Sequence, residues 1–138
     1  MNFVLFILLG IGAVYDIREK KVPVIWIWLF IIVMGIYRMN LWRNGLCNTM
    51  DVILALMPGM LIYLFSCIGE GMGEADGLII LGTGLFFSWQ EHMGMLCLAF
   101  FLAAGFSIGV ILLQNTIKNR KIPFVPFLFS ASLIILCI

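Results

Sequence analysis

Long apolar runs, separated by short polar or glycine-containing stretches, occupy almost the whole chain. None of the runs alternates between polar and apolar positions, as a transmembrane β-strand would. In lipid every backbone N–H and C=O must pair internally, and a helix achieves this within one segment of about 20 residues. The pattern therefore predicts six helical segments, at residues 1–15, 24–41, 52–68, 77–89, 93–113 and 122–138.

The composition narrows the class of protein. Hydrophobic residues make up 64% of the 138 residues, and charged residues only 11%, whereas a soluble domain usually carries about 25% charged residues. We therefore predict an all-α integral membrane protein, in which residues 1–138 form a single domain built as a bundle of about six transmembrane helices. Membrane lipid is its expected surroundings, and a net charge of +1 without a long basic run does not favour a nucleic-acid partner.

The basic residues indicate how the helices are oriented. Six of the eight Lys and Arg side chains lie in two connections, at residues 18–21 and 118–121, and only Arg38 and Arg43 belong to the other side. Because cytoplasmic loops are enriched in Lys and Arg, these two connections are predicted to be cytoplasmic, with the protein in the inner (plasma) membrane. The short linker 90–92 is then predicted to lie outside, with His92 as an interfacial loop residue.

Two aspartates border unusually short apolar runs on the predicted cytoplasmic side. Asp16 directly follows the first run, and Asp76 directly precedes the fourth. Acidic residues are costly near hydrocarbon, so both are candidates for function. If the two carboxyl groups met, they could not easily both be ionised, and one could hold a proton while the other accepted one from water. The alternative is that both are ordinary helix-end carboxylates, favoured at Asp76 by the helix dipole.

A glycine-rich stretch precedes the second aspartate. Residues 69–73 (GEGMG) contain three glycines in five positions, so that this segment is not expected to be helical. A backbone without side chains lets another chain approach closely. The stretch is therefore suited to binding an extended peptide, although a solvated loop is the alternative.

Several segments resemble motifs of the type IV prepilin peptidases. Residues 71–76 (GMGEAD) followed by 77–84 (GLIILGTG) resemble the G-x-G-D motif and the helix after it, and 15–23 (YDIREKKVP) resembles the family's first motif. Residues 121–127 (KIPFVPF) resemble the closing I-P-F-x-P-F segment, and Pro58-Gly59 matches a Pro-Gly pair in the third span. The segments occur in the family's order over nearly the whole chain.

The resemblance implies an aspartic endopeptidase with Asp16 and Asp76 as its catalytic pair. Such an enzyme removes the basic leader from prepilins or pilin-like precursors at the cytoplasmic membrane face, and no metal or cofactor is expected. Acidic and glycine residues around the second motif are then candidates for holding the leader. These candidate substrate-binding residues are Gly71, Gly73, Glu74, Glu70 and Glu19.

This chain departs from the family pattern at three positions. Ala75 replaces the second motif glycine, Leu78 replaces a frequent lysine, and Val24 replaces a frequent asparagine. Because the chain starts directly with an apolar run, it resembles the short members that serve Tad/Flp-type pilus systems and lack the N-terminal methylation domain. The oligomeric state does not follow from these motifs.

Alternatives stay open for the site and for the function. Residues 71–74 form a G-x-G followed by an acid, so Glu74 is a rival to Asp76; we favour Asp76 because it is predicted to lie deeper. A small carboxylate-dependent membrane transporter, or an inactive assembly protein of the same fold, are the rival functions. Separately, Gly105 and Gly109 fit the small-xxx-small pattern of close helix packing.

Overall fold

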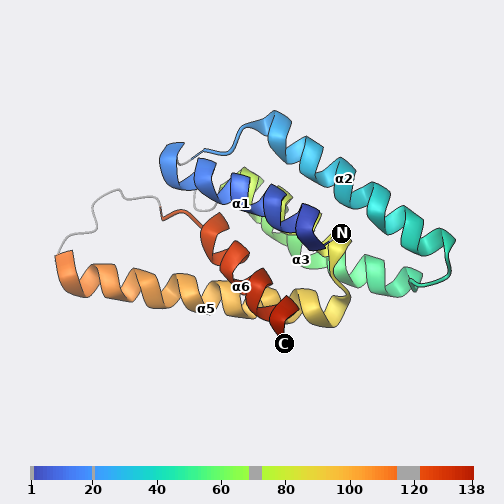
Figure 1. Cartoon of the computed structure of the whole chain (residues 1–138). Helices are drawn as coiled ribbons and strands as arrows, with labels where there is room; N and C mark the ends of the chain where they lie inside the picture. Colours follow the sequence, from blue (N-terminus) through green and yellow to red (C-terminus); the bar gives the residue numbers. More distant parts are fainter. Residues whose placement is uncertain (1, 20, 69–72, 115–121) are drawn as a thin grey trace. The chain divides into compact units, whose positions relative to one another are not determined.

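A computed structural model describes residues 2–19, 21–68, 73–114 and 122–138. All regular secondary structure within these ranges is α-helical, as Figure 1 shows, and the prediction of an all-helical membrane protein with six helices is confirmed. The helices are α1 (Asn2–Glu19), α2 (Val24–Arg43), α3 (Thr49–Ile68), α4 (Glu74–Phe86), α5 (Trp89–Gln114) and α6 (Val125–Cys137).

Three of these helices are long and apolar enough to cross a membrane, namely α2, α3 and α5, while α6 is a shorter apolar helix. Their large hydrophobic side chains are often exposed: Ile25 is 84% exposed and Phe101 is 79% exposed. Water would not tolerate so many exposed apolar side chains, whereas lipid does. These helices therefore present a lipid-facing surface.

The helix boundaries differ from the prediction at functionally relevant places. Helix α1 continues to Glu19, so that Asp16 lies inside it, about one turn before its end. Helix α5 begins at Trp89, and the prediction of a linker at 90–92 was wrong. The reason is a capping box, in which the Glu91 carboxylate accepts hydrogen bonds from the backbone N–H (3.1 Å) and the hydroxyl (2.8 Å) of Ser88.

The chain divides into two compact units, which we describe separately. The first contains the described residues of Met1–Lys21 and Gly94–Ile138, and here α1 packs against α6. The ring of Phe6 meets the ring of Phe129 edge-on, with 6.2 Å between centroids. Gly10, one turn later on α1, faces the same Phe129 ring. An aromatic side chain thus joins the two helices of this unit.

The second unit, Val22–Met93, is built around α4, which packs against both α2 and α3. Helices α3 and α4 run antiparallel, because Ala55 meets Gly84, Gly59 meets Leu81 and Tyr63 meets Gly77. A Cβ atom added at Gly59 would lie 2.6 Å from the Leu81 backbone, and one added at Gly77 would lie 2.8 Å from the Tyr63 backbone.

We call these contacts, made at Gly59, Gly77 and Gly84, the α3–α4 seam. A real Cβ cannot come so close to backbone atoms, so glycine is required at each place for the two helices to approach. On another side of α4, Gly82 makes room for the ring of Phe30 on α2. The glycines of α4 therefore have a packing role that the sequence analysis did not identify.

The predicted close packing at Gly105 and Gly109 was wrong for the described part of the chain. A Cβ added at either glycine would meet no atom within 4 Å. The small-xxx-small pattern identifies a helix face that permits close approach, but another helix must supply the partner.

Candidate active site

The carboxylate of Asp16 is held by the opposite end of the sequence. Asp16 is only 8% exposed, and its Oδ2 atom accepts a hydrogen bond of 3.0 Å from the backbone N–H of Val125. A second backbone interaction comes from Phe124. Val125 is the first residue of α6, and the first backbone N–H groups of a helix have no partner within it. The positive end of the helix dipole also favours a carboxylate there.

Residues of the closing motif explain why α6 begins at Val125. Pro126 occupies the first turn of the helix, where its fixed φ is compatible and its missing N–H is not needed. The rings of Phe124 and Phe127 then pack on α5, with centroids 5.2 Å from Phe100 and 5.4 Å from Phe106, respectively. The motif thus anchors the N-terminus of α6 and directs its free N–H to Asp16.

The second aspartate, Asp76, lies in the first turn of α4 in the other unit. Of the glycine stretch 69–73, predicted to be non-helical, residues 69–72 lie outside the described residues. Gly73 precedes the helix in an extended conformation (φ −68°, ψ 131°), and its carbonyl accepts a hydrogen bond of 3.0 Å from the Asp76 N–H. The Asp76 side chain turns back toward this glycine, since a Cβ added at Gly73 would lie 3.3 Å from its Oδ2 atom. The seam, which fixes α4 on α3, thereby also fixes the helix that carries Asp76.

The two rival acids of the second motif differ in exposure. Glu74 is exposed, whereas Asp76 is half-buried, in agreement with the expectation that Asp76 lies deeper. The phenol of Tyr63 on α3 interacts with both Glu74 and Cys67. Glu19 is exposed in the last turn of α1, while Glu70 and Gly71 lie outside the described residues.

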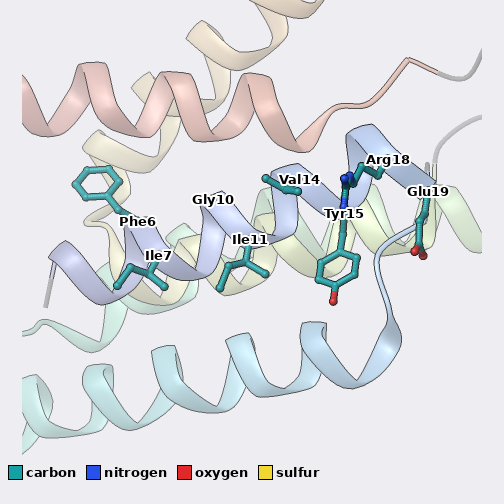
Figure 2. A pocket seen from close by; sticks show the side chains of 8 residues that line it. All are labelled: Phe6, Ile7, Gly10, Ile11, Val14, Tyr15, Arg18 and Glu19. Carbon is teal, nitrogen blue, oxygen red and sulfur yellow. The ribbon is translucent and has the colours of Figure 1, made fainter.

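An apolar groove along α1, with a volume of about 560 Å³, leads to the end that carries Asp16 (Figure 2). Ile7, Ile11 and Val14 line its apolar part, and Arg18 and Glu19 line its polar end. The sequence analysis did not find this groove. The sequence feature that could have indicated the groove is the spacing of three and four residues between these apolar positions, because it places them on one helix face.

His92 was predicted to be an interfacial loop residue, and this prediction was wrong. Helix α5 begins at Trp89, so His92 lies in its first turn. Its side chain is fully buried, and its Nε2 atom lies 3.2 Å from the hydroxyl of Thr83. The Thr83 hydroxyl donates its own proton to the Ile80 carbonyl (2.8 Å), so it accepts from His92. This interaction joins the first turn of α5 to α4. Among the described residues, no three His, Cys, Asp or Glu side chains are grouped to hold a metal ion.

Comparison with known proteins identifies the family. The model of the type IV leader peptidase family matches residues 3–108. A prepilin leader peptidase/N-methyltransferase of Aeromonas salmonicida (strain A449) is 33% identical over 93 residues, which cover 62% of this chain and 32% of that protein. The corresponding protein of Aeromonas hydrophila is 31% identical over 100 residues, covering 67% and 34%.

The chain spans about a third of the length of these curated relatives. No solved structure gives a significant match. The family match covers both aspartates and the α3–α4 seam, while the closing motif that holds Asp16 lies beyond its matched range. The chain belongs to the type IV leader peptidase family.

Proposed function

We propose that this protein is an aspartic endopeptidase that removes the basic leader from prepilins or pilin-like precursors. Cleavage takes place at the cytoplasmic face of the inner membrane, and Asp16 and Asp76 are the catalytic pair. The observation that carries the proposal is the anchored carboxylate of Asp16, a buried acid near the end of α1 that is held by a motif far away in the sequence.

Each aspartate has a defined role in the proposed reaction. The backbone N–H groups of Val125 and Phe124 orient the Asp16 carboxylate, which takes part in binding the attacking water. One carboxylate of the pair accepts a proton from this water as it adds to the scissile carbonyl carbon. The other carboxyl group donates a proton to the departing amine as the peptide bond breaks, and no covalent intermediate forms.

The acidic side chains near the two aspartates suit a basic leader. Glu19 and Glu74 are exposed, so their carboxylates are accessible to the lysine or arginine side chains of a leader. Glu70 adds a third acid in sequence, and Gly71 and Gly73 let the peptide backbone approach closely. Neutralising Glu19 and Glu74 together is expected to raise KM more at low salt than at high salt, because exposed charge pairs are screened.

Cleavage of a co-purified precursor by single variants tests the proposal. Asp16→Asn and Asp76→Asn keep the side-chain shape but cannot exchange a proton, so each is expected to lower kcat by at least about 10³-fold. The double variant is expected to be no slower than either single variant, because the pair acts as a unit. Asp51→Asn, which removes a half-buried carboxylate from the first turn of α3, is the matched control and is expected to cleave normally.

Two results would contradict this assignment. Near-normal cleavage by either aspartate variant would remove that residue from the pair. If Glu74→Gln abolished cleavage and Asp76→Asn retained it, the catalytic role would belong to Glu74. A folded wild-type protein that cleaves no precursor would instead support the assembly-protein alternative.

A further inference from the structure

Tyr63 is an aromatic residue of α3 that has no part in the proposed chemistry. A Cβ atom added at Gly77 would lie 2.8 Å from the backbone N and Cα atoms of Tyr63. Gly77 directly follows Asp76 on α4. The α3–α4 seam therefore holds the backbone of Tyr63 beside the first turn of the helix that carries Asp76, next to the candidate active site.

The antiparallel register of the two helices determines which side chains surround Tyr63. Cys67 lies one turn further along α3, and Glu74 lies one turn before Gly77 on α4. Residues three or four positions apart share a helix face, so Cys67 and Glu74 belong to the side on which Tyr63 and Gly77 meet. The contacts of the phenol agree with this register, because it forms a hydrogen bond with the Cys67 thiol and interacts electrostatically with the Glu74 carboxylate.

We call Tyr63, Cys67 and Glu74 the α3-end cluster. Tyr63 is half-buried, while Cys67 and Glu74 are exposed. Cys67 is the last residue but one of α3, and Glu74 is the first residue of α4. Because the phenol interacts with both of them, its ring extends toward these helix ends and not toward the middle of the span. A peptide that lies at the membrane face can therefore reach the cluster.

The α3-end cluster has the chemistry of a cation site. The face of an aromatic ring attracts a lysine or arginine side chain within about 6 Å of its centroid, and an exposed carboxylate such as that of Glu74 pairs with the same charge. The hydrogen bond to Cys67 restricts the Tyr63 ring, so less conformational entropy is lost on binding. An anionic ligand would be repelled by Glu74, and an apolar ligand would desolvate its carboxylate without compensation.

We propose that Tyr63 is a specificity-determining residue, whose ring binds a lysine or arginine side chain of the precursor's leader together with Glu74. This inference rests on the proposed function, and it adds an aromatic residue to the acids and glycines that hold the leader. Glu74 precedes Asp76 by two residues, or about 3 Å along the axis of α4 at 1.5 Å per residue. The bound cation therefore belongs to a leader residue within a short distance of the scissile bond.

The experiment measures binding, so that it does not depend on cleavage. Purified Asp16→Asn protein in detergent is titrated with two fluorescently labelled precursors, one with its basic leader and one in which glutamine replaces every lysine and arginine of the leader. Tyr63→Leu in the same background should lower the affinity for the basic precursor by about twofold to fivefold, the size of a cation–π contact at an exposed site. It should leave the affinity for the glutamine precursor unchanged.

Two variants of the same helix serve as controls. Tyr63→Phe keeps the ring and removes only the hydroxyl, so it should retain most of the preference for the basic precursor. Phe65→Leu removes a ring that is 70% exposed and lies outside the α3-end cluster, and it should bind both precursors as the parent protein does. Equal losses for both precursors in Tyr63→Leu would mean that Tyr63 serves the fold or anchors α3, and would overturn the proposal. No loss for either precursor would also overturn it.

If Tyr63→Leu does not fold, the Cys67 thiol provides a second measurement in a protein that keeps Tyr63. Serine replaces the other free cysteines, Cys47, Cys97 and Cys137, and the rate at which a maleimide labels Cys67 is followed. The basic precursor should slow this labelling clearly more than the glutamine precursor does, because its cation lies against the ring that contacts Cys67. Equal protection by the two precursors would overturn the proposal.

The two proposals fail in different ways. If the wild-type protein cleaves a precursor but Tyr63→Leu binds the basic and the glutamine precursor with the parent's preference, only the role of Tyr63 is wrong. If the wild-type protein cleaves no precursor while the preference for the basic leader depends on Tyr63, the peptidase assignment is wrong and the cation site stands.

Discussion

The glycines of α4 and those of α5 look alike in the sequence and differ in the structure. On α4, Gly77 and Gly84 each lie against the backbone of α3, where a Cβ would not fit. On α5, Gly105 and Gly109 have nothing within 4 Å. A glycine on an apolar helix thus allows close approach, but a close contact forms only where a neighbouring helix packs against it.

This difference matters for function because α4 carries Asp76. The α3–α4 seam leaves no space for a side chain at three positions, so it determines where α4 lies along α3. An aspartate in the first turn of α4 takes its position from that packing. Gly105 and Gly109 of α5 carry no such constraint within the described chain.

The largest effect is expected from adding a side chain at the centre of the α3–α4 seam. Gly59→Ala would place a Cβ 2.6 Å from the Cα and N atoms of Leu81, so the two helices must move apart. We expect a loss of about 3 kcal/mol in unfolding free energy. Cleavage should fall by about 10²-fold, since a misplacement near 1 Å at a reacting group has that effect.

Gly35→Ala is the matched control for this variant, because Gly35 lies on a helix of the same unit with no atom within 4 Å of an added Cβ. It should melt at or slightly above the wild-type temperature. Equal melting temperatures for Gly59→Ala and Gly35→Ala would show that the seam is not a close contact.

A moderate effect is expected where α4 meets a side chain instead of a backbone. Gly82→Ala would bring a Cβ within 2.5 Å of the Phe30 ring, which can move more easily than a helix backbone. We expect a loss of about 1–2 kcal/mol in stability, measured by thermal denaturation in detergent. Phe30→Leu should recover part of it in the double variant; if the two losses simply add, the ring is not the obstacle.

How well each feature of the structure could be predicted depends on how far apart in the sequence the interacting residues lie. Apolar runs predicted six helices because every residue in a run contributes to the same signal. The capping box of Ser88 and Glu91 is a local interaction, and the sequence contains its S-x-x-E signature at residues 88–91. The charged Glu91 was nevertheless interpreted as part of a linker between two helices.

The interactions that sequence reasoning missed join distant residues. The bond between Asp16 and Val125 spans 109 positions, and the motifs indicated that both ends mattered without indicating that they touch. Likewise, Gly59 and Leu81 have no sequence pattern that pairs them, because their contact depends on the register of two antiparallel helices. The burial of His92 and Arg38 follows from helix packing in the same way.

A smaller and more local effect is expected at the start of α4. Gly73→Ala would place a Cβ 3.3 Å from Oδ2 of Asp76, which is tight, and the carboxylate must shift by a few tenths of an ångström. Cleavage should fall by roughly threefold to tenfold in kcat while the Tm stays near the wild-type value, since Gly73 precedes the helix in an ordinary extended conformation. A drop in Tm without a drop in kcat would mean that the glycine serves the fold and not Asp76.

The smallest effect is expected on α5. Alanine fits the open space at Gly105, and it restricts the unfolded chain and favours a helix more than glycine does. Gly105→Ala should therefore raise stability by up to about 0.5–1 kcal/mol and leave cleavage unchanged. Size-exclusion chromatography with light scattering should give the same mass for wild type and variant. If the variant instead melts lower or loses a subunit, this glycine face packs closely against a second chain. The glycines of both helices would then serve close packing, those of α4 against α3 and those of α5 against another copy of the protein.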